Sequence, residues 1–169
     1  MNTAEIDNTQ IGEQFRATMR LYPATVTIIT ANDGVRDHGM TATAVTSVSM
    51  EPPSMMICLN NRTLLHAMLQ SQPFFAVNVL GHAHPEMSEA FSGKVEPKDR
   101  FKSGGWVRDE MGMMVLPDSH ATVVCSRVAA MPYGTHSVFI GQVMRARVDS
   151  DGRPLLYQDA KYHISHPTD

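Results

Sequence analysis

The chain has 169 residues, a hydrophobic fraction of 43%, a charged fraction of 18% and a formal net charge of −3. These values predict one globular domain over residues 1–169 and exclude an intrinsically disordered chain. No apolar run reaches the roughly 18 residues of a membrane-spanning helix. The balance of 14 basic and 17 acidic residues gives no general attraction for nucleic acid. The polar start MNTAEIDNTQ lacks a secretory signal pattern, so we expect a cytoplasmic protein with no membrane partner.

The first half of the chain alternates short helical and strand patterns. Residues 10–21 place Ile11, Phe15 and Met19 at helical spacing and predict an amphipathic helix that Pro23 closes. Composition predicts a strand at 24–31, a turn at 32–39, a strand at 40–50 ended by Pro52 and Pro53, a strand at 54–60, a helix at 62–71 and a strand at 74–80.

The second half contains a long loop and two long strands. We predict a short helix at 84–91, a loop at 93–112, strands at 119–131 and 136–150 around a turn at 132–134, a turn at 151–154 and a last strand at 155–158. Six or seven strands with three short helices indicate a mostly β domain. Long strands adjacent in sequence favour an antiparallel barrel. No G-x-G-x-x-G follows a strand, which argues against a Rossmann domain.

Cysteine and histidine give no metal-site pattern. Cys58 and Cys125 lie in apolar runs and are expected to be small buried side chains in a reducing compartment. His82 and His84 form an H-A-H pair, but no third ligand has a recognisable spacing, so no metal is expected.

The segment GMTATAVTSVSMEPP at residues 39–53 is unusually rich in small and hydroxyl-bearing side chains. Such a segment lets backbone approach a flat ligand and offers hydroxyl and amide groups to ring heteroatoms. Composition alone also allows an ordinary edge strand.

Two further sites carry possible chemistry. The sequence NNRT at 60–63 precedes a predicted helix, where Asn60 or Asn61 could cap the helix or the segment could bind phosphate. His136 follows the turn PYG and begins a strand, where an imidazole can bind a carboxamide, move a proton or serve a structural role.

These pieces occur together in an order that resembles the flavin reductase family, the small reductase component of two-component flavin monooxygenases. The resemblance covers residues from about 13 to 166. It rests on FRATMRLYPATVTIIT, GMTATAVTSVSMEPPSMMICLNNRT, His66, FAVNVL, AFSGK, DRF, Trp106, ATVVCSRV, YGTHSVFIGQV and PLLYQDAKYH. The T-A-x-x-x-x-S-V-S-x-x-P-P pattern within residues 41–53 is the most specific part.

The resemblance implies a flavin-binding split β-barrel with a Greek-key-like strand order, acting as a homodimer. Such proteins oxidise NADH or NADPH, reduce FMN or FAD, and in many cases pass the reduced flavin to an oxygenase component. Carried onto this chain, it implies flavin-binding residues Thr41, Ala42, Thr43, Ala44, Val45, Ser47, Val48, Ser49, Cys58, Leu59, Asn60, Asn61, Arg62, Thr63, Ala90, Phe91, Ser92 and Tyr162. It also implies that His136 meets the nicotinamide as the catalytic residue.

Two departures from the family pattern affect these expectations. Thr135 stands where many members have Asp, and Ala90 stands where many have Arg. Phosphate binding would therefore depend more on Arg62, Lys94 or Arg100. The absence of an arginine cluster favours NADH over NADPH. The alternatives are a flavin carrier or electron-transfer protein without turnover, a pyridoxamine-phosphate-oxidase-like barrel and a flavin-independent structural barrel.

Overall fold

The computed structural model describes residues 8–149 and 151–168. Its helices are α1 Asn8–Leu21, α2 Leu64–Ser71, α3 Pro85–Glu89, a π-helical turn η1 Ala90–Lys94 and a 3₁₀ segment η2 Pro97–Lys102. Its strands are β1 Ala24–Thr25, β2 Thr27–Asn32, β3 Asp37–Ala42, β4 Val45–Met50, β5 Pro53–Asn60, β6 Phe74–Val79, β7 Val107–Arg108, β8 Met114–Val115, β9 Ala121–Tyr133, β10 His136–Val148, β11 Leu155–Gln158 and β12 Lys161–Ile164.

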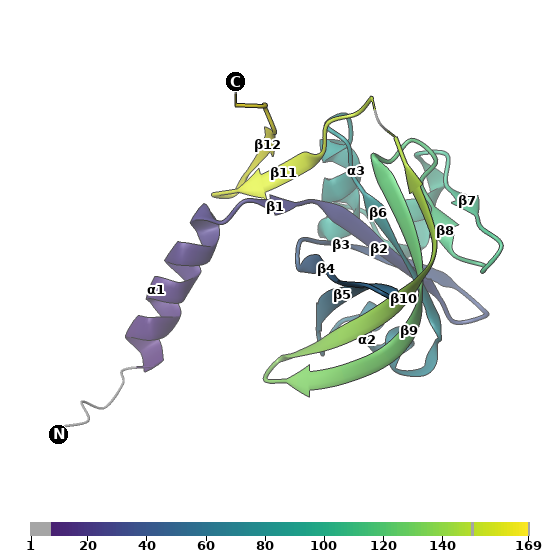
Figure 1. The fold of residues 1–169 in the computed structure, drawn as a ribbon, viewed down its shortest axis with the longest axis horizontal. Coiled ribbons are helices and arrows are strands. Elements are labelled where there is room, and N and C mark those ends of the chain that lie inside the picture. The colour runs from purple at the N-terminus through teal and green to yellow at the C-terminus, as the bar shows by residue number, and fades with distance from the viewer. Residues whose placement is uncertain (1–7, 150, 169) are drawn as a thin grey trace.

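A seven-stranded antiparallel sheet organises the molecule, with the strand order β3-β2-β6-β9-β10-β5-β4. Its two edge strands, β3 and β4, are consecutive in the sequence, yet within the described ranges no strand pairing joins them. The sheet curves, but its hydrogen-bond ladder does not close, so the strands do not form the closed antiparallel barrel that the long strands favoured (Figure 1). A smaller sheet, β1-β11-β12, lies beside it. The predicted mostly β fold with a few short helices is confirmed.

The main core lies between α2 and the seven-stranded sheet. Leu65, Met68 and Leu69 form the buried face of α2 and belong to one cluster with Phe75 and Phe139 from the sheet. A second cluster lies under α3 and η1, where Phe91 packs with Phe101 and Trp106. Burial on this scale favours folding by roughly 25 cal/mol for each Å² of apolar surface removed from water.

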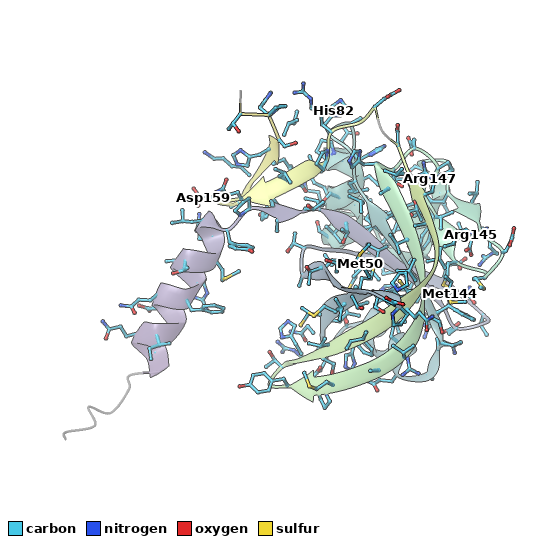
Figure 2. All side chains as sticks on the ribbon, in the orientation of Figure 1. Met50, His82, Met144, Arg145, Arg147 and Asp159 are labelled. Carbon is cyan, nitrogen blue, oxygen red and sulfur yellow. The ribbon has the colours of Figure 1, made fainter. Side chains whose placement is uncertain are left out.

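Helix α1 projects away from the rest of the molecule and meets it at its C-terminal end, near β11 and β12 (Figure 1). Away from α1, the C-terminal part of β10 carries Met144, Arg145 and Arg147 (Figure 2). The Arg147 guanidinium donates to the carbonyl oxygens of Leu116 at 3.2 Å and Ser119 at 3.0 Å, and so fixes the connection into β9.

The predicted strand at 40–50 is wrong as a single element. It is divided into β3, which pairs with β2, and β4, which pairs with β5. Thr43 and Ala44 lie between them, where the Val45 amide donates to the Thr43 carbonyl at 3.0 Å. One straight strand could not pair with β2 at one edge of the sheet and β5 at the other. The predicted turn at 32–39 is correspondingly too long, since β3 already begins at Asp37.

Other element boundaries also differ. The predicted helix at 84–91 ends as an α-helix at Glu89 and continues as the π-helical turn η1. The predicted loop at 93–112 contains η2 and β7. Strand β9 extends through Pro132 and Tyr133, where a turn was expected, and β12 was not predicted. Ser150, the predicted end of the last long strand, lies outside the described residues.

Candidate functional site

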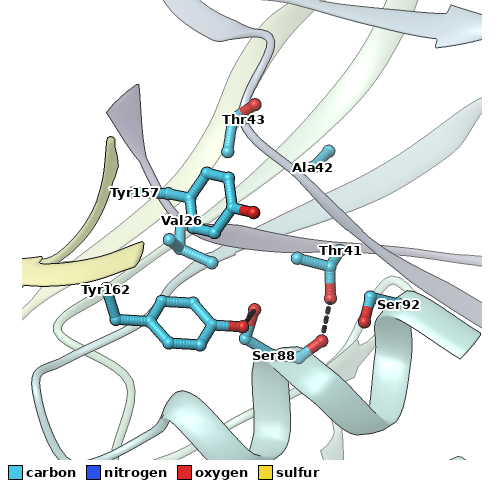
Figure 3. Close-up of a pocket in the computed structure, with 8 residues that line it drawn as sticks. All are labelled: Val26, Thr41, Ala42, Thr43, Ser88, Ser92, Tyr157 and Tyr162. Atoms are coloured by element: carbon cyan, nitrogen blue, oxygen red, sulfur yellow. Dashed lines mark hydrogen bonds between the residues drawn. The ribbon is translucent and has the colours of Figure 1, made fainter. Parts of the chain in front are cut away.

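A first cavity of about 260 Å³ lies where β3, α3, η1 and the β11–β12 hairpin meet (Figure 3). No residue that lines it is charged. Its lining consists of Val26, Thr41, Ala42, Thr43, Ser88, Ser92, Tyr157 and Tyr162. Hydroxyl groups and two phenol rings suit a flat, uncharged ring system with polar atoms on its edge.

Three side chains hold this first cavity in shape. The Thr41 hydroxyl donates to the Ser88 carbonyl oxygen at 2.6 Å, and the Tyr162 hydroxyl donates to Ser88 Oγ at 3.0 Å (Figure 3). Ser88 is only 1% exposed. Buried polar groups are normally hydrogen-bonded, and these bonds join β3, α3 and β12 around the cavity.

Tyr157 connects the first cavity with a second one, because it lines both. Its ring meets that of Tyr162 edge to face, with centroids 5.6 Å apart at 63°. The two tyrosines are register partners across β11 and β12.

The second cavity, of about 710 Å³, lies between α1 and the edge formed by β4 and β5. Its lining is mainly apolar and consists of Arg16, Met19, Arg20, Tyr22, Ala24, Thr43, Ala44, Val45, Thr46, Met56, Cys58, Tyr157, Gln158, Asp159 and Ala160. Thr43 belongs to both cavities. The break between β3 and β4, with its small side chains, therefore borders both cavities.

The predicted flavin-binding residues divide into two groups. Those that the structure brings together around the cavities are Thr41, Ala42, Thr43, Ala44, Val45, Cys58, Ser92 and Tyr162. Those whose side chains line neither cavity are Ser47, Val48, Ser49, Leu59, Asn60, Asn61, Arg62, Thr63, Ala90 and Phe91. The predicted catalytic residue, His136, lines neither cavity either. Leu59 and Phe91 are each 1% exposed and pack in the hydrophobic core.

The far part of β4 has a register shift against β5 between Ser47 and Ser49, and its side chains line neither cavity. Ser49 Oγ donates to the Glu51 carbonyl at 2.9 Å and accepts the Glu51 amide at 3.0 Å. Val48, in the irregular position, is half exposed. Ser49 therefore stabilises the turn before β5.

Helix α2 is capped by Thr63, not by Asn60 or Asn61. Thr63 Oγ1 accepts the His66 amide at 3.2 Å. Asn60 Oδ1 accepts the Arg62 amide, and the Asn60 carbonyl accepts the Thr63 amide, both at 3.0 Å. Because these two amides are satisfied, a phosphate here would depend on the Arg62 guanidinium, which has no ion pair or hydrogen bond within the described part of the chain.

Two of the cations considered for phosphate are already engaged. Arg100 is buried, and its guanidinium donates to the carbonyls of Val95 at 3.0 Å and Gly39 at 2.9 Å. Lys94 forms an ion pair with Glu89 at 2.6 Å. Arg100 therefore ties the segment after η1 to β3 and is a structural residue in this conformation.

His136 is exposed and begins β10 opposite Asn60, the last residue of β5. Val138 and Cys58 are the next outward-facing pair, and paired residues on antiparallel strands share a face. His136 thus lies one such step, roughly 7 Å along the strand, from a residue that lines the second cavity. Its Nδ1 is 2.9 Å from the Thr135 hydroxyl, and Nε2 has no hydrogen-bond partner among residues 8–149 and 151–168.

The two cysteines differ in environment, and neither forms a disulfide. Cys125 is buried in the core, and burial raises its pKa to about 12. Cys58 is partly buried and lines the second cavity. Cys58 is therefore the thiol at the candidate site.

Sequence reasoning missed Val26, Ser88 and Tyr157 in the first cavity and the α1 residues in the second. Ser88 could not be found because it acts through a carbonyl oxygen and a buried hydroxyl. Tyr157 could have been found if the β11–β12 hairpin had been predicted, because residues paired across two strands lie on the same face, and Tyr157 pairs with the predicted Tyr162.

Among the described residues, no group of three His, Cys, Asp or Glu side chains could hold a metal ion. None of the described helices has the length and hydropathy that a membrane crossing needs.

Comparison with known proteins identifies the family. Residues 19–166 match the flavin reductase like domain. The chain is 58% identical over 159 residues to the reductase component of an FADH2-dependent resorcinol hydroxylase from a Rhizobium species, covering 93% of this chain and 89% of the relative. It is 34% identical over 149 residues to the FMN reductase (NADH) RutF of Variovorax paradoxus, covering 88% and 83% respectively.

Solved structures agree with the sequence relatives. The NADH:FAD oxidoreductase of Streptomyces globisporus, in complex with NAD and FAD fragments, superposes with a TM-score of 0.87 at 28% identity and covers 97% of this chain and 98% of its own. The flavin reductase HpaC complexed with NADP⁺ gives a TM-score of 0.84 at 25% identity, covering 91% and 97%. The chain belongs to the flavin reductase family. The predicted family and its class, NAD(P)H-dependent flavin reductase, are confirmed.

Proposed function

We propose that this protein transfers hydride from NADH or NADPH to FMN or FAD and supplies the reduced flavin to a separate oxygenase component. The observation that carries the proposal is a pair of adjacent cavities that share Thr43 and Tyr157 at the break between β3 and β4, in a chain of this family. The named relatives, a hydroxylase reductase component and an FMN reductase (NADH), support it.

The residues around the cavities fit a flavin. Thr43 and Ala44 present small side chains at the junction, so a flat ring can approach the backbone. Tyr157 and Tyr162 supply aromatic walls, and the uncharged lining of the first cavity leaves no carboxylate to repel an electron-rich ring. The flavin, when bound, supplies the redox chemistry. The protein binds it, orients it and excludes water.

We assign nicotinamide recognition to His136. Its position on the same sheet face as Cys58 and its free Nε2 support a hydrogen bond to a carboxamide at the outer side of the second cavity. His136→Ala should lower turnover with NADH roughly 10- to 100-fold, about 1.4 to 2.7 kcal/mol of transition-state stabilisation. Flavin affinity should change less than about threefold. An unchanged kcat/KM for NADH would remove the role.

The decisive experiment mixes the protein with NADH and each free flavin and follows the flavin absorption band under anaerobic conditions. Rapid bleaching of many equivalents of flavin per protein supports the reductase, whereas slow bleaching of a single equivalent supports a flavin carrier.

A second experiment measures stability. Flavin at about 100 times its dissociation constant should raise the free energy of unfolding by about 2.7 kcal/mol. No stabilisation by FMN or FAD would contradict flavin binding. Rates with all four flavin and nicotinamide pairs would establish the preferred substrates.

We also propose a cytoplasmic homodimer. Large apolar side chains are exposed on α1, where Phe15 is 64% exposed, and on the β9–β10 hairpin, where Met131 and Tyr133 are 61% and 84% exposed. A two-fold partner would cover such surface. Two free cysteines support a reducing compartment. Light scattering that gives 18.7 kDa, the mass of one chain, would contradict the dimer.

A further inference from the structure

The wall that α1 gives to the second cavity carries two arginines in different states. Arg16 and Arg20 are four residues apart and therefore share one helix face. The Arg20 guanidinium donates to Asp159 Oδ1 from Nε at 2.9 Å and from Nη2 at 2.8 Å, so these charges neutralise each other. Arg16 forms no ion pair or hydrogen bond with any residue that the structure describes. Its guanidinium is the unpaired charge among the residues that line this cavity.

This arrangement is fixed by contacts at the end of the helix. The Asp159 amide donates to the Arg20 carbonyl at 2.7 Å, and the Gln158 side chain donates to the Leu21 carbonyl at 2.7 Å. Asp159 lies where α1 meets the β11–β12 hairpin (Figure 2). These bonds satisfy carbonyl groups that a helix end leaves free. They anchor the helix, so Arg16 is held one turn away from the anchor and beside the cavity.

The rest of the lining defines what the free guanidinium can recognise. Tyr22 and Tyr157 offer aromatic surface, and Met19 and Met56 offer adaptable apolar surface. A single cation beside such a surface suits an anionic group attached to a flat aromatic ring. Arginine also matches phosphate geometry better than lysine does, because its planar donors can form two parallel hydrogen bonds.

Size points to a dinucleotide. The second cavity, at about 710 Å³, is larger than the first, at about 260 Å³, and shares Thr43 and Tyr157 with it. A ring in the first cavity leaves the second for a further part of the same ligand or for a second ligand. FAD and NAD(P)H both carry an adenosine diphosphate half, whereas riboflavin has no phosphate and FMN has one.

We propose that the second cavity binds the diphosphate of a dinucleotide and that Arg16 is its cation. The inference rests on the proposed function, in which FAD or NAD(P)H is a substrate. Arg16 is a binding and specificity residue, because it separates ligands with a diphosphate from riboflavin. The Arg20–Asp159 pair positions it.

The test compares Arg16→Gln and Arg16→Lys with Lys98→Gln, which removes an exposed cation of η2 that lines neither cavity. Dissociation constants are measured by calorimetry for riboflavin, FMN, FAD, NAD⁺ and ADP, without turnover. Arg16→Gln should weaken binding of at least one dinucleotide about tenfold, roughly 1.4 kcal/mol. Riboflavin should bind as before. Arg16→Lys should recover part of the loss, and Lys98→Gln should behave as wild type.

The pattern of loss identifies the source of the diphosphate. Weaker FAD with unchanged NAD⁺ assigns the cavity to the flavin dinucleotide, and the converse assigns it to the nicotinamide dinucleotide. Equal weakening of riboflavin and FAD would show a structural effect and overturn the inference, as would unchanged affinity for FAD, NAD⁺ and ADP. If the wild-type protein reduces flavin but Arg16→Gln binds every ligand normally, the inference fails while the proposed function stands. If the wild type binds none of these ligands, both fail.

Discussion

The hydrogen bond from Tyr162 to Ser88 gives a quantitative test of how the first cavity is built. Tyr162→Phe keeps the ring that lines the cavity and removes only the hydroxyl, which donates to Ser88 Oγ at 3.0 Å. Ser88→Ala removes the acceptor and keeps the backbone carbonyl that binds the Thr41 hydroxyl. The two substitutions, made singly and together, isolate one interaction between the C-terminal hairpin and α3.

The expected magnitude follows from burial. A typical hydrogen bond contributes about 1 kcal/mol net, and a buried partner left alone costs about 1 to 3 kcal/mol. Ser88 is 1% exposed, so each single variant should lose at least about 1 kcal/mol. For a chain of this length, that lowers the melting temperature by about 2 to 4 °C per kcal/mol. The double variant removes both partners and should lose less than the sum, by about 1 kcal/mol.

The measurement is urea unfolding of the four flavin-free proteins under one condition. Tyr133→Phe is the matched control, because Tyr133 is 84% exposed and outside this network, and its stability should stay within about 0.5 kcal/mol of wild type. Strictly additive losses for Tyr162→Phe and Ser88→Ala would show that the two hydroxyls do not interact. The assignment of this bond as the link between hairpin and helix would then be refuted.

Three further outcomes are expected. Gly141→Ala should destabilise by about 1 to 3 kcal/mol in thermal unfolding, since a Cβ there would lie 2.5 Å from Phe75 and 2.6 Å from Cys125; a loss below 0.5 kcal/mol would contradict the close packing. Iodoacetamide should label Cys58 and spare Cys125, whose pKa burial raises to about 12, as followed by mass spectrometry. Saturating flavin should slow the labelling of Cys58. Equal labelling of the two cysteines would contradict the difference in their environments. Burial lowers the pKa of His38 in the folded protein, so the unfolded chain binds more protons below about pH 6.5 and stability falls as the pH drops. The urea midpoint of unfolding, measured from pH 8 to 5, should therefore depend less on pH in His38→Gln than in the wild type. The same pH dependence in both proteins would contradict this.

Local patterns in the sequence were sufficient for elements that a single physical preference determines. The long strands β9 and β10 follow from β-branched composition, and α2 follows from the spacing of Leu65, Met68 and Leu69. The break at Thr43 and Ala44 could not be read in this way. Both sides of it have strand composition, and the division arises because β3 and β4 pair with different neighbours, which is a property of the whole sheet.

The candidate site shows the same division. Small side chains in a row drew attention to the 39–53 segment, but composition alone also allowed an edge strand. The family resemblance selected residues 41–45 and added Cys58, Ser92 and Tyr162. The contribution of α1 was invisible. Its apolar spacing predicted only an amphipathic helix. In the structure, hydrogen bonds hold the helix at one end, and Arg16 from the helix lines a cavity.

The sequence does not show which basic side chain is free to bind phosphate, because it does not show which of them already have partners. In the sequence, Arg62, Lys94 and Arg100 were equal candidates for phosphate, and Arg16 was none. The structure engages Lys94 with Glu89 and Arg100 with two carbonyls, which leaves Arg62 before α2 and Arg16 on α1 without partners in the described ranges.

Arg16 is the cation of the proposed diphosphate site, and Arg62, which lines neither cavity, would be a separate cation for a phosphate bound before α2. A reaction between two nucleotides brings two anionic substrates to one site. One shared cation would draw both phosphate groups together, where like charges about 4 Å apart repel by roughly 1 kcal/mol in water and several times that near a protein surface. Separate cations on α1 and before α2 avoid this repulsion. Two separate cations would allow a flavin phosphate and a dinucleotide diphosphate to be held at once.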